Sequence, residues 1–173
     1  MDNPARRQIL ARMEHDADIL IVGGGLNGPA LALALADGGF RVTVVDARPA
    51  PARATTGFDG RAYALAIASR RLLAAIGVWS GIAARAQPML RIVTTDGHPG
   101  QGAAPFFLAF DHAEIEEGPM GFMIEDRHLY AAFLSAMSAH PRVTLLSGET
   151  VTDQQIAPAS VMVRLGSGRM LTG

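Results

Sequence analysis

Residues 18 to 49 read DILIVGGGLNGPALALALADGGFRVTVVDARP, and this stretch decides the fold. A short apolar run, Ile19 to Val22, stops at a cluster of glycines, as expected for a parallel strand that is buried on both faces. The alanine- and leucine-rich segment Asn27 to Ala36 predicts a helix that ends at two glycines. The β-branched run Arg41 to Val45 predicts a second strand. Together these elements predict a βαβ unit.

Three glycines between the first strand and the helix have the spacing of a dinucleotide-binding fingerprint. Gly23 permits a tight turn, Gly25 lets backbone approach a pyrophosphate, and Gly28 lets the helix pack closely on the strand. The helix would offer its first N–H groups to phosphates. Asp46 would accept hydrogen bonds from ribose hydroxyls and repel a 2′-phosphate, which favours NAD or FAD over NADP. The alternative is that the glycines only allow close packing and Asp46 caps a turn.

The rest of the chain is predicted to add elements around this unit. The predictions are a loop at 47–60, helices at 62–76, 80–86 and 126–138, short strands within 89–124, a parallel strand at 143–146 and antiparallel strands beyond it. The helix over 62–76 offers its leucines and isoleucine for burial, and Asp126 is a plausible N-cap. The predicted fold class is α/β: a Rossmann-like sheet with a small β insertion at about 89–124 and a terminal antiparallel β meander.

The composition excludes several functional classes. The 15 Lys and Arg residues against 16 Asp and Glu leave no basic surplus for binding nucleic acid. The absence of cysteine excludes disulfides, iron–sulfur clusters and a thiol nucleophile, and the scattered histidines predict no metal site. Residues 1–17 mix both signs of charge, so they are interpreted as a leader without a secretory signal. Residues 19–36 are apolar enough for a membrane span, but their clustered glycines favour a strand, turn and helix.

Two later stretches narrow the choice of nucleotide. They are DGRAYALAIASRRLLAAIGVW at residues 59–79 and GFMIEDRHLYAAFLSAM at residues 121–137. With the glycine fingerprint before them, they resemble the flavin-dependent aromatic hydroxylases of ubiquinone biosynthesis, a branch of the flavoprotein monooxygenases similar to para-hydroxybenzoate hydroxylase. The resemblance covers residues 18–173. In that family the fingerprint and the acid after the second strand bind the ADP half of FAD, so the resemblance implies FAD as the cofactor.

The resemblance assigns three more residues to the FAD site. Arg61 matches the arginine of the family's D-x-R segment, which implies a guanidinium beside the pyrophosphate or the ribityl chain; the alternative is an exposed loop arginine. Arg127 matches the arginine of the E-x-R-x-L segment, with pairing to Glu125 or Asp126 as the alternative. Val151 falls where the family's backbone contacts the adenine. No catalytic residue is assigned, because a flavin supplies the chemistry and the protein positions it.

The resemblance also implies a reaction, which is hydroxylation of a polyprenylated phenol or quinol with oxygen, and with NAD(P)H as the reductant. Family members are longer, so residues 18–173 are expected to be a partial FAD-binding domain, truncated before the substrate domain and inactive alone. The expected partners are an apolar aromatic small molecule, oxygen and a ubiquinone-biosynthesis complex. The expected location is the cytoplasm or the periphery of the inner membrane. Another FAD- or NAD-dependent oxidoreductase and a non-catalytic nucleotide-binding module remain open as alternatives.

Overall fold

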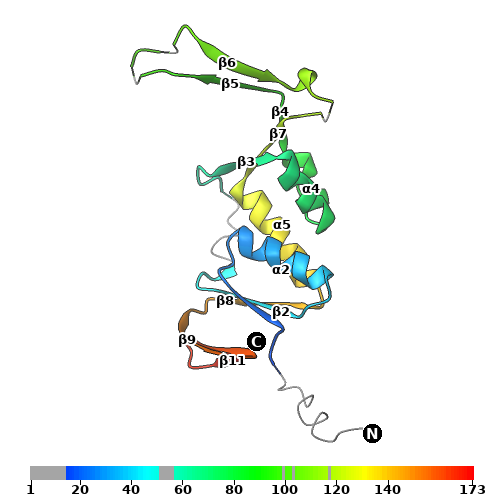
Figure 1. Cartoon of the computed structure of the whole chain (residues 1–173), viewed down its shortest axis with the longest axis vertical. Coiled ribbons are helices and arrows are strands. Elements are labelled where there is room, and N and C mark those ends of the chain that lie inside the picture. The colour runs from blue at the N-terminus through cyan, green and yellow to red at the C-terminus, as the bar shows by residue number, and fades with distance from the viewer. Residues whose placement is uncertain (1–14, 51–56, 99, 103, 117) are drawn as a thin grey trace, which may run out of the picture. The chain divides into compact units, whose positions relative to one another are not determined.

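The computed structural model describes residues 15–50, 57–98, 100–102, 104–116 and 118–173 (Figure 1). The chain divides into two compact units. Residues 1–54 and 133–173 belong to the first, called unit 1 here, and residues 55–132 form unit 2. The sequence predicted one partial FAD-binding domain over residues 18–173. The division into two compact units does not test this prediction.

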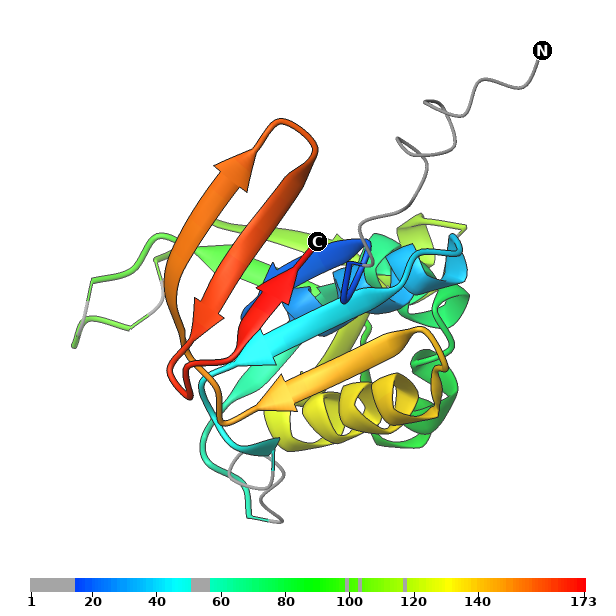
Figure 2. The ribbon, with the colours of Figure 1, turned by 90° about the horizontal axis from the view of Figure 1, so that it is seen from below.

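Unit 1 contains the predicted βαβ unit. Its parallel sheet has the order β1-β2-β8, formed by β1 (Ile19–Val22), β2 (Val42–Asp46) and β8 (Val143–Ser147). All five residues of β2 are buried, and β2 has a parallel strand on each side. Helix α2 (Asn27–Asp37) joins β1 to β2 and buries Leu33. Figure 2 shows the three strands side by side and pointing the same way. The predicted α/β class with a parallel sheet is confirmed.

The expectation that β1 is buried on both faces is wrong. β1 is an edge strand of this sheet and pairs with β2 alone. Its first three residues are half-buried, and Val22 is 64% exposed. Val22 lines the two pockets described below, so the strand is least covered where it meets the glycines.

The predicted terminal meander is confirmed. It consists of β9 (Val151–Ala157), β10 (Ser160–Leu165) and β11 (Met170–Thr172). The strands pair in the order β11-β10-β9, and the turn from β10 to β11 contains Gly168 with a φ of +88°, which favours glycine. Leu165 and Leu171 are buried in one cluster with Val45 of the parallel sheet, so the two sheets of unit 1 share a core.

The segment before β1 is tied to the last strand of the meander. The Asp16 carboxylate accepts hydrogen bonds from the Thr172 N–H at 2.8 Å and from the Thr172 hydroxyl at 3.1 Å. The Ala17 N–H donates to the Thr172 carbonyl at 3.3 Å. Two segments separated by 156 positions are therefore held together in unit 1.

Unit 2 is largely antiparallel. Its strands are β3 (Ala62–Ala66), β4 (Gln87–Met89), β5 (Arg91–Thr95), β6 (Phe107–Asp111) and β7 (Gly121–Glu125). One sheet has the order β3-β7-β4, and β5 pairs with β6 in a separate ribbon, green in Figure 1. The short strands predicted within residues 89–124 are confirmed. β7 is the central strand of its sheet, because β3 and β4 pair with it on opposite sides.

The helix predicted over residues 62–76 is wrong in its first part. Residues 62–66 form β3, and helix α4 covers Ile67–Ala75. Along β3 the half-buried Tyr63 and Leu65 alternate with exposed alanines, which is the period of a strand. All five residues pair with β7, and this pairing overrides the helical propensity of alanine.

Helix α4 buries a narrower face than expected. Leu73 and Ile76 are buried as predicted, but Leu72 is 48% exposed.

The single helix expected at 80–86 is instead a pair of 3-10 helices, Trp79–Gly81 and Ala83–Arg85. The residue between them is Ile82, which is buried, and its φ of −122° interrupts the helical backbone.

Helix α5 (Asp126–Ala139) agrees closely with the predicted helix, and its buried residues include Leu129 and Phe133. Asp126, expected to be the N-cap, is the first residue of the helix.

Within the described residues no single helix has the length and hydropathy of a membrane span. The pair Ile67–Ala75 and Trp79–Arg85, bent by 117°, meets that criterion only when taken together.

Candidate functional site

The glycine fingerprint forms the turn between β1 and α2. Gly23 has a φ of +113°, which L side chains rarely adopt, and its N–H donates to the Val45 carbonyl at 2.8 Å. A Cβ at Gly28 would lie 1.9 Å from the Gly23 carbonyl oxygen. The helix can therefore approach the strand this closely only when residue 28 has no side chain, which is the role predicted for Gly28.

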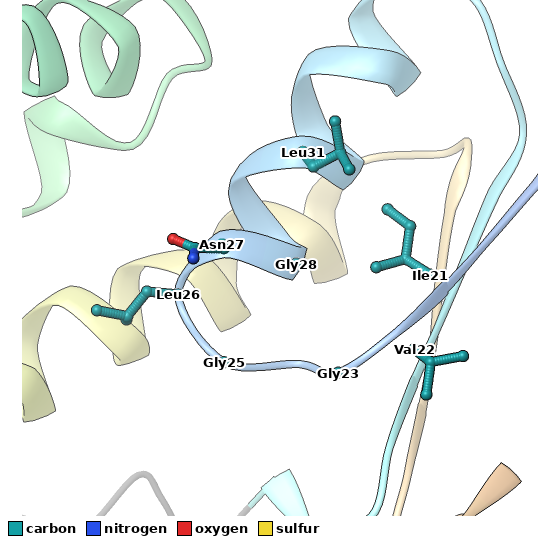
Figure 3. A pocket seen from close by; sticks show the side chains of 8 residues that line it. All are labelled: Ile21, Val22, Gly23, Gly25, Leu26, Asn27, Gly28 and Leu31. Carbon is teal, nitrogen blue, oxygen red and sulfur yellow. The ribbon is translucent and has the colours of Figure 1, made fainter.

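A pocket of 370 Å³ opens at this turn. Figure 3 shows its lining: Ile21, Val22, Gly23, Gly25, Leu26, Asn27, Gly28 and Leu31. The first N–H groups of a helix have no intrahelical acceptor, and those of residues 25–28 have no backbone acceptor within the described part of the chain. Pro29, the third helical residue, removes an N–H that would also lack an acceptor. The pocket therefore has backbone donors and the positive end of the helix dipole at one wall.

Asp46 lies beside the same turn. It is 8% exposed, and its Oδ1 accepts a hydrogen bond from the Arg48 N–H at 3.0 Å. The turn-capping role considered as an alternative for Asp46 is therefore present. The other carboxylate oxygen, Oδ2, would be 2.4 Å from a Cβ at Gly24. Gly24, which the fingerprint spacing does not include, is thus required to let the turn pass the carboxylate.

A second pocket of 270 Å³ brings three of the predicted site residues together. It is lined by Val22, Gly23, Val45, Asp46, Ala47, Glu149, Thr150 and Val151. The Asp46 carbonyl accepts hydrogen bonds from the N–H groups of Gly148 at 2.8 Å and Glu149 at 3.1 Å. These bonds hold the connection from β8 to β9 against the end of β2. Gly23, Asp46 and Val151 consequently share one pocket, although they are distant in the sequence.

Arg61, at the start of β3, has two carboxylate partners in unit 2. Its Nε donates to Asp59 Oδ2 at 2.8 Å, and its Nη2 lies 3.1 Å from Asp126 Oδ2. The hydrogen bond from Arg61 holds the pKa of the Asp59 carboxyl below its usual value. The Arg61 side chain is 44% exposed, so the guanidinium is both held and accessible to a ligand.

Arg127, in the first turn of α5, is paired with Glu125. Its Nε contacts Glu125 Oε2 at 2.5 Å, which is the pairing considered as an alternative for this residue. The pair offsets the unfavourable position of a cation near a helix N-terminus. The next residue, His128, has a lowered pKa, mainly because of burial and then because of the charges of Arg85 and Arg127.

The pairing of β3 with β7 places both arginines at one end of the unit 2 sheet. Ala62 lies opposite Glu125, and the Asp126 N–H donates to the Arg61 carbonyl at 3.0 Å. Arg61 and Arg127 are therefore neighbours in the fold, although 66 positions separate them in the chain.

The contacts of Asp126 with Tyr63 and Arg61 were missed in the sequence, where Asp126 was interpreted as a helix N-cap and as one possible partner of Arg127. Its carboxylate is buried and accepts a hydrogen bond from the Tyr63 hydroxyl at 3.1 Å. No local pattern relates residues 63 and 126, so only the strand pairing reveals this contact. Among the described residues, no group of three or more His, Asp or Glu side chains could hold a metal ion.

The arrangement in unit 1 fits the ADP half of a dinucleotide. Side chains are excluded at Gly24 and Gly28, so backbone lines the turn and can approach a pyrophosphate. The carboxylate of Asp46 can accept hydrogen bonds from ribose hydroxyls at the end of β2. This geometry alone is common to NAD and FAD sites.

Comparison with known proteins decides between these cofactors. The model of the FAD dependent oxidoreductase family matches residues 18–117. The chain belongs to the FAD-dependent oxidoreductases. Membership of this family supports FAD as the cofactor, and it confirms the predicted family of FAD-binding oxidoreductases. The roles of the individual residues in binding FAD stay predictions.

Two curated relatives are hydroxylases by name. The ubiquinone hydroxylase UbiL of Rhodospirillum rubrum is 43% identical over 136 residues, which are 79% of this chain and 30% of the relative. The 3-demethoxyubiquinol 3-hydroxylase of Escherichia coli is 42% identical over 130 residues, which are 74% of this chain and 32% of the relative. The chain thus spans about a third of the length of these relatives.

Solved structures of flavin monooxygenases share the fold. The p-nitrophenol 4-monooxygenase PnpA of Pseudomonas putida superimposes with a TM-score of 0.71 at 19% identity, over 89% of this chain and 38% of that one. The flavin-dependent monooxygenase PieE, solved with FAD and substrate, has a TM-score of 0.65 at 21% identity, over 90% of this chain and 28% of that one. These similarities confirm the predicted fold class.

Proposed function

We propose that this chain provides the ADP-binding part of a flavin-dependent monooxygenase that hydroxylates a polyprenylated phenol or quinol in ubiquinone biosynthesis. The observation that carries the proposal is the buried Asp46 carboxylate, which lies against a turn whose glycines leave no room for side chains. The names of the two hydroxylase relatives support the reaction class.

The residues of unit 1 have separate tasks in this proposal. The N–H groups of residues 25–28 would donate to the pyrophosphate of FAD, and Asp46 would accept hydrogen bonds from the ribose of its adenosine half. Val151, in the pocket shared with Asp46, would present backbone to the adenine. FAD supplies the redox chemistry when it is bound, and the chain's contribution is to bind and orient it.

Two arginines of unit 2 are also assigned to FAD, through their charge. Arg61 and Arg127 are brought to one end of the unit 2 sheet, and an arginine fork suits the oxygens of a phosphate. We assign Arg61 to the pyrophosphate or ribityl side of FAD and Arg127 to FAD as well. Both assignments rest on the family resemblance together with this clustering.

The proposal extends to the wider reaction on the strength of the family resemblance. NAD(P)H would reduce the flavin, and oxygen and an apolar aromatic molecule would be the other substrates. A ubiquinone-biosynthesis complex, in the cytoplasm or at the periphery of the inner membrane, would be the setting. Support for this setting comes from the family resemblance and from the apolar character that a polyprenyl tail gives a substrate.

Titration of the purified chain with FAD and with NAD, followed by fluorescence, tests the proposal. The chain should bind FAD more tightly than NAD, and Asp46→Asn should weaken FAD binding by about ten- to a hundredfold, because a hydrogen bond to a charged group contributes about 1.5 to 3 kcal/mol. Asp153→Asn, an exposed position on β9 outside both pockets, is the matched control and should bind as the unmodified chain does. Tighter binding of NAD would instead favour another oxidoreductase.

A further inference from the structure

The Arg61 guanidinium lies between two carboxylates of very different exposure. The side chain of Asp59 is 43% exposed, whereas that of Asp126 is 2% exposed. Both carboxylates contact the same guanidinium, Asp59 through Nε and Nη2 and Asp126 through Nη2. One arginine therefore has one buried and one exposed anionic partner.

The buried partner is fixed by the fold. Asp126 is the first residue of α5, where a carboxylate is favoured by the helix dipole. Its Oδ1 accepts a hydrogen bond from the Tyr63 hydroxyl at 3.1 Å, and its N–H donates to the Arg61 carbonyl at 3.0 Å. These bonds join the start of α5 to β3 and to Arg61, the residue before β3, so Asp126 is tied to the sheet at both its backbone and its carboxylate.

Within the described part of the chain, the exposed partner is held by Arg61 and by the local turn. Asp59 Oδ1 accepts from the Arg61 N–H at 3.1 Å, two residues along the chain. Exposed ion pairs contribute little stability, because water solvates both groups well when they separate. A phosphate, like this carboxylate, offers a pair of anionic oxygens, and a guanidinium binds either group through parallel N–H donors.

We propose that Asp126 is a positioning residue that holds Arg61 ready for a phosphate of FAD, and that Asp59 occupies the guanidinium until FAD replaces it. This inference rests on the proposed function, because it needs FAD to be the ligand of Arg61. The two carboxylates then have opposite effects on the cofactor: Asp126 supports its binding and Asp59 competes with it.

Opposite effects can be measured with matched variants. Asp126→Asn and Asp59→Asn each remove one negative charge and keep the size of the side chain. FAD affinity, measured by quenching of flavin fluorescence, should fall about tenfold for Asp126→Asn, the loss of one charged hydrogen-bonding partner. It should rise about two- to threefold for Asp59→Asn, the scale of an exposed pair. Thermal unfolding checks that both variants are folded.

A second pair of variants separates positioning from a general structural role. In an Arg61→Gln background, Asp126→Asn should cause no further loss of FAD affinity, since the group that Asp126 positions is already gone. Tyr63→Phe, which removes one hydrogen bond from Asp126 without changing charge, should weaken FAD binding by a smaller factor than Asp126→Asn.

Several results would overturn the inference. They are unchanged or weaker FAD binding by Asp59→Asn, wild-type affinity of Asp126→Asn, and an equal loss caused by Asp126→Asn with and without Arg61. If Asp126→Asn does not fold, the sign of the Asp59→Asn effect decides. Failure of the unmodified chain to bind FAD would overturn the proposed function as well, whereas normal FAD binding with any of the other results overturns this inference alone.

Discussion

Substitution of Gly28 by alanine tests two consequences of the close approach between helix and strand. The added Cβ would lie 1.9 Å from the Gly23 carbonyl oxygen and 3.1 Å from its carbon. Real Cβ contacts are essentially never shorter than 3.0 Å, so α2 and the turn must separate by about 1.1 Å, the difference of the two distances. The neighbour is backbone and cannot rotate away. In an unobstructed helix the same change would stabilise by about 1 kcal/mol.

The expected result is a loss of both stability and cofactor affinity. Overpacking typically costs about 1 to 3 kcal/mol, which exceeds the gain in helix propensity. A shift of about 1 Å also takes the N–H groups of the turn outside the narrow range of hydrogen-bond distances. Urea unfolding should therefore show a lower midpoint, and FAD titration should show at least tenfold weaker binding. Gly81→Ala, where the new Cβ would meet only the Ala132 Cβ at 3.7 Å, is the control. A Gly28→Ala variant with unchanged midpoint and affinity would refute this reasoning.

Three further outcomes are expected. The hydrogen bond from the Thr172 N–H lowers the pKa of the Asp16 carboxyl. The stability that this carboxylate contributes is therefore present above its ordinary pKa of 3.8 and is lost as pH falls below that value. Asp16→Asn should remove this acid dependence when unfolding is measured as a function of pH. Burial and two arginines lower the pKa of His128, so the unfolding free energy should fall as pH drops below 6.5. His128→Gln should flatten this part of the stability profile against pH. An unchanged slope would contradict the role given to His128. Phe133→Ala should reduce the unfolding free energy by about 3 to 5 kcal/mol, because Phe133 is buried, whereas Phe106→Ala at an 86% exposed position should change it by less than about 0.5 kcal/mol.

The elements that the sequence predicted well are those with strong local punctuation. β1 and α2 have the predicted starts because the glycines between them stop one element and begin the next. β8 was predicted from a continuous apolar run, and the meander from its turn residues. In each case the signal and the structure it specifies lie within a few residues of each other.

The elements that were missed depend on partners far along the chain. Residues 62–66 are alanine-rich and predict a helix locally, but their pairing with residues 121–125 makes them a strand. The exposure of Val22 likewise depends on which strand occupies the edge of the sheet. A single sequence contains no direct signal for either relationship.

The candidate site also has a part that the local sequence predicts and a part that depends on distant strand pairing. Gly23, Gly28 and Asp46 form the expected local cradle, because one βαβ unit contains all of them. The contact of Asp126 with Tyr63 and the proximity of Arg61 to Arg127 arise only from strand pairing. The resemblance to a family supplied the two arginines, and its segments also contain Asp59 and Glu125, but it gave no sign of the contact between Arg61 and Asp126.

The central place of β2 has a consequence for the order in which the chain folds. One neighbour of β2 precedes it directly, but the other, β8, is synthesised about a hundred residues later. On the ribosome, residues 55–132 can form their own contacts while β2 still has an open edge. Closing so long a loop is slow, so this open apolar edge is the point at which a nascent chain would most need a chaperone.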